Sequence, residues 1–311
     1  MTKYLVTGGA GFIGSHVAEE LVRRGHKVTV LDNFFTGKRE NIAPFMDKIE
    51  LIEGDIRDMD ICRQSLEDVD FVLHQAALPS VPRSIEDPVL ASEINIQGTL
   101  NLLVASRDAG IKKFVFASST SVYGDDPSLP KEEGREGKPL SPYAVSKIAG
   151  EMYCQVFSRI YGLSTVCLRY FNVFGPRQDP FSQYAAVIPN FITKTLKGES
   201  STIFGDGEQS RDFTYVSNVV EANFLAAEAQ NVTGEIFNIA CGEKTSVNSL
   251  AKKINELLGK DISPVHDEPR PGDILHSLAD ISKAKKMLKY DPLVSIDEGL
   301  EKTIRWFQEE E

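Results

Sequence analysis

Tyr143 and Lys147 are the residue pair with the clearest chemical potential in this chain. They are four positions apart in a stretch of helical periodicity, so a helix would place the ammonium group near the phenol on one face. Lowering the pKa of a tyrosine from about 10 to near 7 requires about 4 kcal/mol of preferential stabilisation of the phenolate. A neighbouring lysine contributes to that stabilisation. The pair indicates a tyrosine that moves a proton, although a tyrosine after Pro142 could also be a surface aromatic at a helix start.

A second signal is the glycine-rich segment Thr7–Gly14, which separates a short apolar run from a helical one. Gly8, Gly11 and Gly14 can permit a tight turn, close approach of the backbone to a pyrophosphate, and contact between helix and sheet. The helix N-terminus that follows favours an anion. The segment therefore predicts a dinucleotide site.

Asp32 refines this prediction because it ends the next apolar run, 18 positions after Gly14. A carboxylate at that place can accept hydrogen bonds from both ribose hydroxyls of adenosine, and it would repel a 2′-phosphate. We therefore expect NAD as the cofactor rather than NADP. The alternative is that Asp32 only caps the following turn through Asn33.

The elements that must position these residues alternate between strands and helices, as in βαβ units around a parallel sheet. Gly25, Gly110 and Gly162 stand where C-terminal helix caps are expected. The expected strands are Lys3–Thr7, Lys27–Leu31, Ile49–Glu53, Phe71–His74, Lys113–Ala117 and Ser164–Arg169. The expected helices are Phe12–Arg24, Asp58–Leu66, Val89–Ala109 and Ser141–Tyr161. The fold class is thus α/β, with a doubly wound, Rossmann-like parallel sheet and a second, smaller α/β lobe.

The second lobe begins where proline and glycine become frequent, after Gly175. The stretch Asp212–Ala227 followed by Glu235–Ala240 again has the pattern of a helix and a strand, so the chain is expected to return to the first domain. We expect an NAD-binding domain of residues 1–175 with a return segment at about 212–240. Residues 176–211 and 241–311 would form the lobe that holds the substrate.

Composition excludes several other classes of protein. With 41% hydrophobic and 25% charged residues, the chain resembles an ordinary globular protein. A net charge of -11 argues against nucleic acid as a ligand, and the absence of a long apolar run argues against a membrane span. Because a strand begins at Lys3, we expect no signal peptide and a cytoplasmic protein. The expectation for the cysteines is buried free thiols with no metal site: Cys62, Cys154, Cys167 and Cys241.

Taken together, the motifs resemble the extended short-chain dehydrogenase/reductase family, in the branch of NAD-dependent nucleotide-sugar epimerases and dehydratases. The resemblance spans essentially the whole chain. Besides the glycine segment and Tyr143–Lys147, the motifs that carry it are His74–Ala77, Ser118–Gly124, Arg169–Pro176 and Gly205–Asp212.

The loop after the fifth strand distinguishes between activities within that branch. The 4,6-dehydratases carry an Asp-Glu pair where this chain has Thr120 and Ser121, and UDP-glucuronate decarboxylases keep a glutamate at the second position. The chain therefore resembles the 4-epimerases. Its segments Gln178–Pro180 and Tyr184–Pro189 look most similar to those of UDP-N-acetylglucosamine 4-epimerases.

The resemblance implies a mechanism for inversion at C4 of a UDP-hexose. Tyr143, as phenolate, would remove the proton from the sugar O4 while hydride passes to NAD, with Lys147 and Ser119 completing the catalytic set. A 4-keto sugar would rotate and be reduced on its other face. The residues implied to bind the cofactor are Gly8, Gly11, Phe12, Ile13, Gly14, Asp32, Asn33, Gly37, Asp55, Ile56, Gln75, Ala76, Ala77, Ser118, Tyr143, Lys147 and Tyr170.

The resemblance also implies a substrate site. Phe204 would contact uracil, Arg211 and Arg270 the pyrophosphate, and Asp273 a ribose. The full set implied to bind substrate is Ser80, Ser119, Thr120, Tyr143, Asn172, Gln178, Ala186, Val187, Phe204, Gln209, Arg211, Arg270, Asp273 and Ser277. For the arginines, the alternative is an exposed surface pair.

Two positions bear on specificity and on retention of the cofactor. Pro79 stands where the better-known UDP-glucose/galactose epimerases carry a lysine that helps hold NAD, and Ser277 stands where epimerases restricted to non-acetylated sugars carry a tyrosine. We expect UDP-GlcNAc/UDP-GalNAc and UDP-Glc/UDP-Gal as substrates. The alternatives are a UDP-glucuronate 4-epimerase, another nucleotide-sugar epimerase or a non-catalytic NAD-binding regulatory protein. The long helices 89–109 and 141–161 predict a homodimer with a four-helix contact.

Overall fold

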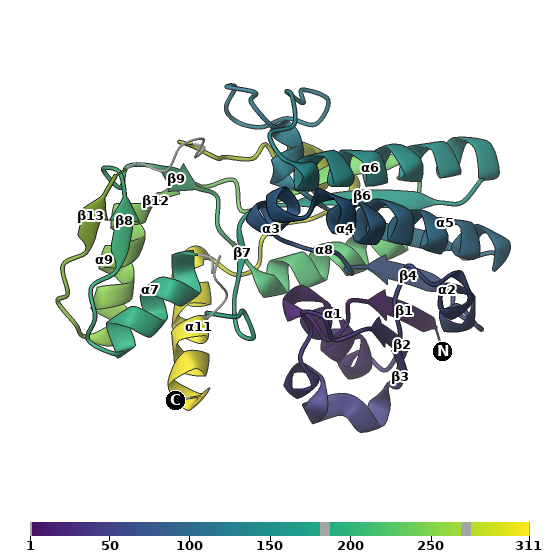
Figure 1. Cartoon of the computed structure of the whole chain (residues 1–311), viewed down its shortest axis with the longest axis horizontal. Coiled ribbons are helices and arrows are strands. Elements are labelled where there is room, and N and C mark those ends of the chain that lie inside the picture. Colours follow the sequence, from purple (N-terminus) through teal and green to yellow (C-terminus); the bar gives the residue numbers. More distant parts are fainter. Residues whose placement is uncertain (1, 181–186, 269–274, 311) are drawn as a thin grey trace.

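The centre of the molecule is a seven-stranded parallel sheet with the strand order β11-β6-β5-β4-β1-β2-β3 (Figure 1). The computed structural model describes residues 2–180, 187–268 and 275–310. Strand order reverses between β1 and β4, which is where open α/β sheets bind ligands. The strands are β1 (Lys3–Thr7), β2 (Lys27–Asp32), β3 (Glu50–Glu53), β4 (Phe71–His74), β5 (Lys113–Ser119), β6 (Thr165–Tyr170) and β11 (Glu235–Ile239). The expected fold class is confirmed.

Helices cover both faces of the sheet because side chains alternate along each strand. In β1, Tyr4 and Val6 enter one hydrophobic core while Leu5 enters the other. The first core is covered by α1 (Phe12–Arg23), α8 (Val216–Glu228) and α10 (Ser282–Met287). The second is covered by α2 (Met59–Ser65), α4 (Pro88–Ser92), α5 (Thr99–Asp108) and α6 (Pro142–Tyr161), with α3 (Val81–Glu86) packed on α4 and α6. Short helical turns lie at η1 (Arg39–Asn41), η2 (Ala43–Lys48) and η4 (Thr120–Tyr123).

One expected helix is divided. The stretch 89–109 is not a single α-helix: a π-helical segment, η3 (Glu93–Gly98), separates α4 from α5. The buried Asn95 side chain accepts a hydrogen bond from Leu78 N at 2.7 Å. Gly98 lies so close to Ile56 that an added Cβ would be 2.5 Å from that side chain. The widened turn therefore coincides with contacts to the loops after β3 and β4, which helical periodicity does not encode.

A smaller lobe has its own hydrophobic cluster beside the sheet, at the left of Figure 1. The helix expected from Asp212 begins at Val216, and β11 returns the chain to the main sheet next to β6. The division into two domains stays a prediction. The lobe's elements are α7 (Val187–Leu196), α9 (Val247–Leu258), α11 (Ile296–Glu310) and the strand pairs β7 (Val173–Phe174) with β10 (Thr214–Tyr215), β8 (Thr202–Phe204) with β13 (Val265–Asp267), and β9 (Ser210–Arg211) with β12 (Thr245–Ser246).

The four cysteines carry free thiols. Cys62, Cys154 and Cys167 are buried as expected, but Cys241 is partly exposed because it follows the end of β11, where the chain leaves the sheet. Within the described ranges, no helix combines the length and the apolar character that crossing a membrane requires.

Candidate active site

A cavity of about 960 Å³ lies at the carboxyl ends of the sheet strands. Its walls come from the turns that follow β1 to β4, the end of β5 and the end of β6. Every residue that the sequence analysis assigned to the cofactor lines it: Gly8, Gly11, Phe12, Ile13, Gly14, Asp32, Asn33, Gly37, Asp55, Ile56, Gln75, Ala76, Ala77, Ser118, Tyr143, Lys147 and Tyr170. Residues at the ends of six strands, or in the turns that follow them, are thus brought to one place.

The glycine turn forms the floor of this cavity. Gly8 has a φ of +66°, and Gly11 N donates to Gly8 O at 3.1 Å, which closes the turn. A Cβ on Gly14 would be 2.1 Å from Gly8 O, so only glycine fits there. Gly11 is the N-cap of α1 and has no side chain, so the first N–H groups of the helix remain open to an anion.

Asp32 braces the turn and also faces the cavity. Its Oδ2 accepts a hydrogen bond from Ala10 N at 2.9 Å, and its Oδ1 accepts one from Phe34 N at 2.8 Å. Burial raises the pKa of Asp32, whereas the two backbone donors lower it. The capping role therefore exists, through Phe34 rather than Asn33, and it leaves the carboxylate lining the pocket.

Replacing Asp32 by serine should narrow the preference for NAD over NADP, because the charge that repels a 2′-phosphate is lost. The measurement is the ratio of the two dissociation constants by calorimetry. Asp32→Asn is the matched control for shape, since its amide oxygen can still accept one backbone bond. Asp32→Asn should reduce the preference for NAD over NADP as much as the serine variant does, but its melting temperature should be closer to that of the parent protein. An unchanged ratio in both variants would show that the carboxylate serves only the turn.

Tyr143 and Lys147 occupy successive turns at the start of α6. Ser141 Oγ caps this helix by accepting from Ala144 N at 3.1 Å, and proline fills the first helical position. Tyr143 N donates to Ser84 Oγ at 3.1 Å, which ties the helix start to α3. Ser119, at the end of β5, hydrogen-bonds with the Tyr143 side chain. The structure therefore brings together the three residues expected to be catalytic.

The electrostatics of this corner favour neutral groups unless further charge is present. Burial raises the pKa of Tyr143 to about 12, and the hydrogen bond with Ser119 opposes this rise. Burial lowers the pKa of Lys147 to about 8, and Glu151 opposes that fall. Lys147 Nζ donates to Ala117 O at 2.8 Å and lies 5.7 Å from the centre of the Tyr143 ring. A phenolate here needs a second positive charge besides Lys147.

The residues present fit NAD. The cavity volume is at the upper end of the range of roughly 300–1,000 Å³ typical of ligand sites. Asp32 suits the adenosine ribose, the open end of α1 suits the pyrophosphate, and the pair on α6 lies at the other side of the sheet's switch point. The oxidised nicotinamide carries the positive charge that the tyrosine requires.

The residues expected to bind substrate are divided between two places. Ser80, Tyr143 and Gln178 also line the cavity. Outside its lining are Ser119, Thr120, Asn172, Val187, Phe204, Gln209, Arg211 and Ser277. Ala186, Arg270 and Asp273 lie outside the described residues.

Part of the second group gathers in the small lobe. Gln209 Nε2 donates to Phe204 O at 2.8 Å, and Arg211 NH1 donates to Leu275 O at 3.2 Å. Ser277 N donates to Ser210 O at 2.9 Å, so this serine lies beside the strand that carries Arg211. The aromatic ring, the guanidinium group and the serine therefore come from neighbouring segments.

The sequence analysis missed several polar and aromatic residues that line the cavity. Arg83 lies over the Phe35 ring at 5.4 Å, and Lys38 pairs with Asp179 at 3.7 Å. Arg177, also in the lining, pairs with Glu19 at 2.6 Å. Except for Asp179 in the segment Gln178–Pro180, none of these residues stands in a recognisable motif. The available signal was position, because loops after the carboxyl ends of parallel strands face the ligand.

Known proteins are similar to this chain in sequence and in fold. Residues 4–240 match the model of the NAD dependent epimerase/dehydratase family. A putative UDP-glucose 4-epimerase of Methanocaldococcus jannaschii is 44% identical over 306 residues, covering 98% of each chain. The UDP-N-acetylglucosamine 4-epimerase of Methanobrevibacter ruminantium, solved with UDP-N-acetylmuramic acid, is 44% identical with a TM-score of 0.95, covering 100% of this chain and 99% of that one. The UDP-glucuronic acid 4-epimerase of Bacillus cereus, solved with its substrate and NAD, is 35% identical with a TM-score of 0.92, covering 100% of both.

Proposed function

Because this chain belongs to the NAD-dependent epimerase/dehydratase family and is a UDP-sugar 4-epimerase that uses NAD, we propose that it interconverts UDP-GlcNAc and UDP-GalNAc. UDP-Glc and UDP-Gal are further substrates, since a pocket that admits an N-acetyl group does not exclude a smaller hydroxyl. The observation that carries the proposal is the serine at position 277, beside the strand of Arg211.

The geometry around α6 supports the catalytic roles that we propose. Tyr143, as phenolate, takes the proton from the sugar O4 hydroxyl and later returns it on the other face. Lys147 stabilises the phenolate, and Ser119 forms a hydrogen bond with the sugar O4. NAD, when bound, supplies the hydride acceptor and donor for C4. The intermediate is a 4-keto sugar that turns about its link to UDP, so the reaction inverts C4 without net oxidation.

The small lobe holds the UDP group in this proposal. Phe204 contacts uracil, Arg211 and Arg270 bind the pyrophosphate, and Asp273 binds a ribose hydroxyl. The inner wall comes from Asn172, Ala186 and Val187. Residues 1–175 with about 212–240 then form the NAD domain, and residues 176–211 and 241–311 form the substrate domain. A fixed UDP group is what allows the sugar alone to turn.

A panel of UDP-sugars tests the substrate proposal. Purified enzyme is incubated with UDP-GlcNAc, UDP-Glc and UDP-GlcA, and the C4 epimers are separated by chromatography. Turnover of the first two supports the proposal. Turnover of UDP-GlcA alone would identify a glucuronate epimerase instead, and would contradict it.

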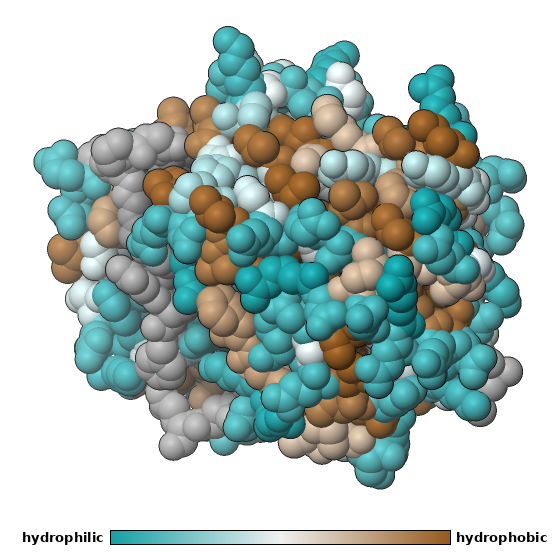
Figure 2. Space-filling model, turned by 45° about the vertical axis from the view of Figure 1, so that its right-hand side comes forward, coloured by the Kyte–Doolittle hydropathy of each residue, from teal (hydrophilic) through white to brown (hydrophobic). Residues whose placement is uncertain are grey.

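We also propose a homodimer that forms through the stretch 89–109, which contains most of α4 and all of α5, and through α6. On α6, the exposed large apolar side chains include Val145 (47%), Met152 (61%), Val156 (43%) and Ile160 (67%), which follow one another at intervals of seven, four and four positions. Figure 2 shows hydrophobic residues gathered in the upper half of the face, at the height of α4 and α6 in Figure 1. Within the stretch 89–109, Leu103 is buried in the core and is not available for this contact. A second copy would cover the exposed stripe.

Solution scattering at micromolar concentration should give the mass of two chains. The double variant Met152→Glu/Val156→Glu should give the mass of one chain, because it places charges in the contact. Leu293→Glu is the matched control: that side chain is 72% exposed and lies outside α4 and α6, so the dimer should persist. A monomeric parent protein would contradict the proposal.

A further inference from the structure

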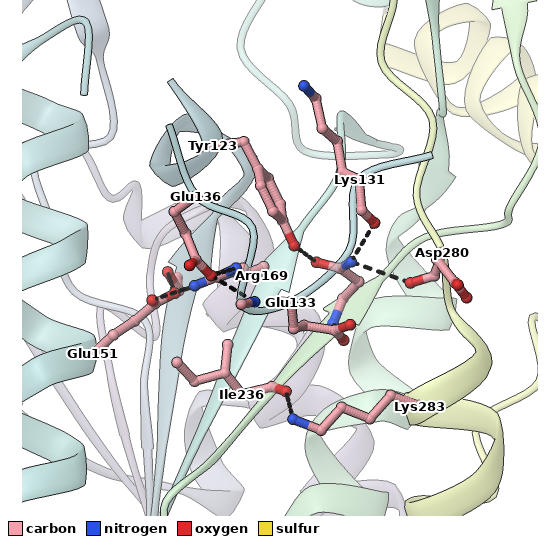
Figure 3. A network of polar contacts seen from close by, with 12 residues as sticks. Tyr123, Lys131, Glu133, Glu136, Glu151, Arg169, Ile236, Asp280 and Lys283 are labelled. Carbon is pink, nitrogen blue, oxygen red and sulfur yellow. Dashed lines mark hydrogen bonds and ion pairs between the residues drawn. The ribbon is translucent and has the colours of Figure 1, made fainter. Parts of the chain in front are cut away.

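Behind the Tyr143–Lys147 pair lies a buried network of ion pairs (Figure 3). Glu151 Oε1 accepts hydrogen bonds from Ser118 Oγ at 2.5 Å and from Arg169 Nε at 2.8 Å. Its Oε2 accepts from Arg169 NH2 at 2.7 Å. Arg169 NH1 pairs with Glu136 at 2.6 Å, and its guanidinium lies over the Tyr123 ring at 4.9 Å. The Arg169 side chain is 1% exposed and that of Glu151 is 5% exposed.

Glu151 stands one helical turn beyond Lys147 on the same face of α6, and Lys147 stands one turn beyond Tyr143. The three ionisable side chains therefore follow one another along the helix from the cavity inwards. Lys147 is itself only 4% exposed. An ammonium group at such a depth requires an anion nearby.

The other elements around Lys147 do not bring an anion to it in the described part of the chain. From β4 comes His74, whose ring nitrogens bond to the hydroxyls of Thr7 and Thr99. Burial and the nearby Lys147 lower its pKa to about 3, so it is uncharged at neutral pH. From β5, Ala117 O accepts the bond from Lys147 Nζ.

Arg169 on β6 adds a second buried cation to the same region, so the charges must be counted together. Lys147 and Arg169 carry two positive charges, and Glu151 and Glu136 carry two negative ones. With all four ionised the set is neutral, and Glu133 is a further carboxylate that interacts with Arg169. Without the Glu151 charge, the buried Lys147 would lose the anion one helical turn away and would release its proton more readily.

We propose that Glu151 is a positioning residue that keeps Lys147 protonated during catalysis, with Arg169 holding the Glu151 carboxylate in place. The inference rests on the proposed role of Lys147 in stabilising the Tyr143 phenolate. The register of the sheet makes the arrangement possible, because Ser118 of β5 lies beside Arg169 of β6 and both reach the same carboxylate.

The expected effect appears in the dependence of kcat on pH. Catalysis needs the ammonium form, so activity falls above the pKa of Lys147, which burial lowers to about 8. Glu151→Gln removes the opposing charge and keeps the side-chain shape. The alkaline limb of the kcat–pH profile, where activity falls as Lys147 loses its proton, should therefore move to lower pH by about one unit. At a pH above the pKa of Lys147 in both proteins, the variant should then keep about tenfold less of its maximal activity than the parent does.

Glu136→Gln is the matched control. It removes a carboxylate that pairs with the same arginine, but at the end of the network away from Lys147. The alkaline limb of its kcat–pH profile should therefore stay within about 0.3 pH units of the parent's. Glu151→Asp keeps the charge and withdraws it by one methylene. It should give a smaller downward shift, and it carries the test if Glu151→Gln does not fold. Thermal melting of each variant separates loss of stability from a change in the pH profile.

A second readout does not depend on turnover. The 13Cε NMR signal of Lys147 in lysine-labelled protein, assigned by its absence in Lys147→Arg, should titrate at lower pH in the Glu151 variants than in the parent. The inference would be overturned if the Glu151 variants were less stable than the parent but showed the same alkaline limb of the kcat–pH profile and the same titration of Lys147. If instead Lys147→Met epimerises normally, the proposed function of Lys147 fails. The two failures are thus distinguishable.

Discussion

Tyr143→Phe should reduce kcat by about 10³-fold while NAD remains bound. The change removes only the oxygen that carries the proton, and the ring that helps to line the cavity remains. The hydrogen bond with Ser119 is lost, but no charge becomes buried. Binding and chemistry should therefore separate, with an unchanged dissociation constant for NAD by calorimetry and almost no C4 inversion by chromatography.

Tyr153→Phe is the matched control for this variant. Tyr153 lies farther along the same helix and packs against the core that α6 helps to cover. The Tyr153→Phe variant should therefore epimerise at close to the parent rate. Near-normal turnover in the Tyr143 variant would refute its role as the proton carrier. Loss of NAD binding would show that the phenol holds the cofactor instead.

Ser277→Tyr should suppress activity on UDP-GlcNAc and UDP-GalNAc and leave much of the activity on UDP-Glc. The buried Ser277 is held through its backbone to Ser210, so a larger side chain cannot move away without breaking that pairing. Overpacking a closed site costs about 1 to 3 kcal/mol, which corresponds to a loss of roughly 5- to 150-fold in kcat/KM for the acetylated pair.

The measurement is kcat/KM on both sugar pairs with the same enzyme preparation. Ser277→Ala is the control for loss of the hydroxyl alone, and it should retain both activities. Equal losses on both pairs in the tyrosine variant would mean that position 277 does not control the C2 substituent, and the substrate proposal would then lose its main support.

The sequence predicted the strands of the sheet and the glycine turn accurately because both depend on local patterns. The bounds of β1 and β4 agree with the structure, and α6 differs from the expected Ser141–Tyr161 only in that Ser141 is its cap. Short continuous apolar runs define such strands because both faces of the parallel sheet are covered, and Ser, Pro and Gly mark the ends of such helices through interactions between residues a few positions apart. The same holds for the turn that Gly8 begins.

The rest depended on residues that are distant in the sequence. Helical periodicity could not reveal the π-helical turn at Glu93–Gly98, since its contacts come from the loops after β3 and β4. The pairings of Lys38 with Asp179 and of Arg83 with Phe35 join segments that are far apart in the sequence.

The chain by itself thus determined the fold class, the cofactor turn and the Tyr143–Lys147 pair, because those are set by spacing within single elements. Only the tertiary structure decided which charges surround that pair. Glu151 is an ordinary helical glutamate in the sequence, 18 positions from Arg169. Its spacing from Lys147 is set within α6, but its carboxylate is held in place because parallel pairing of β5 with β6 brings Ser118 and Arg169 to it. Burial strengthens every interaction among those charges.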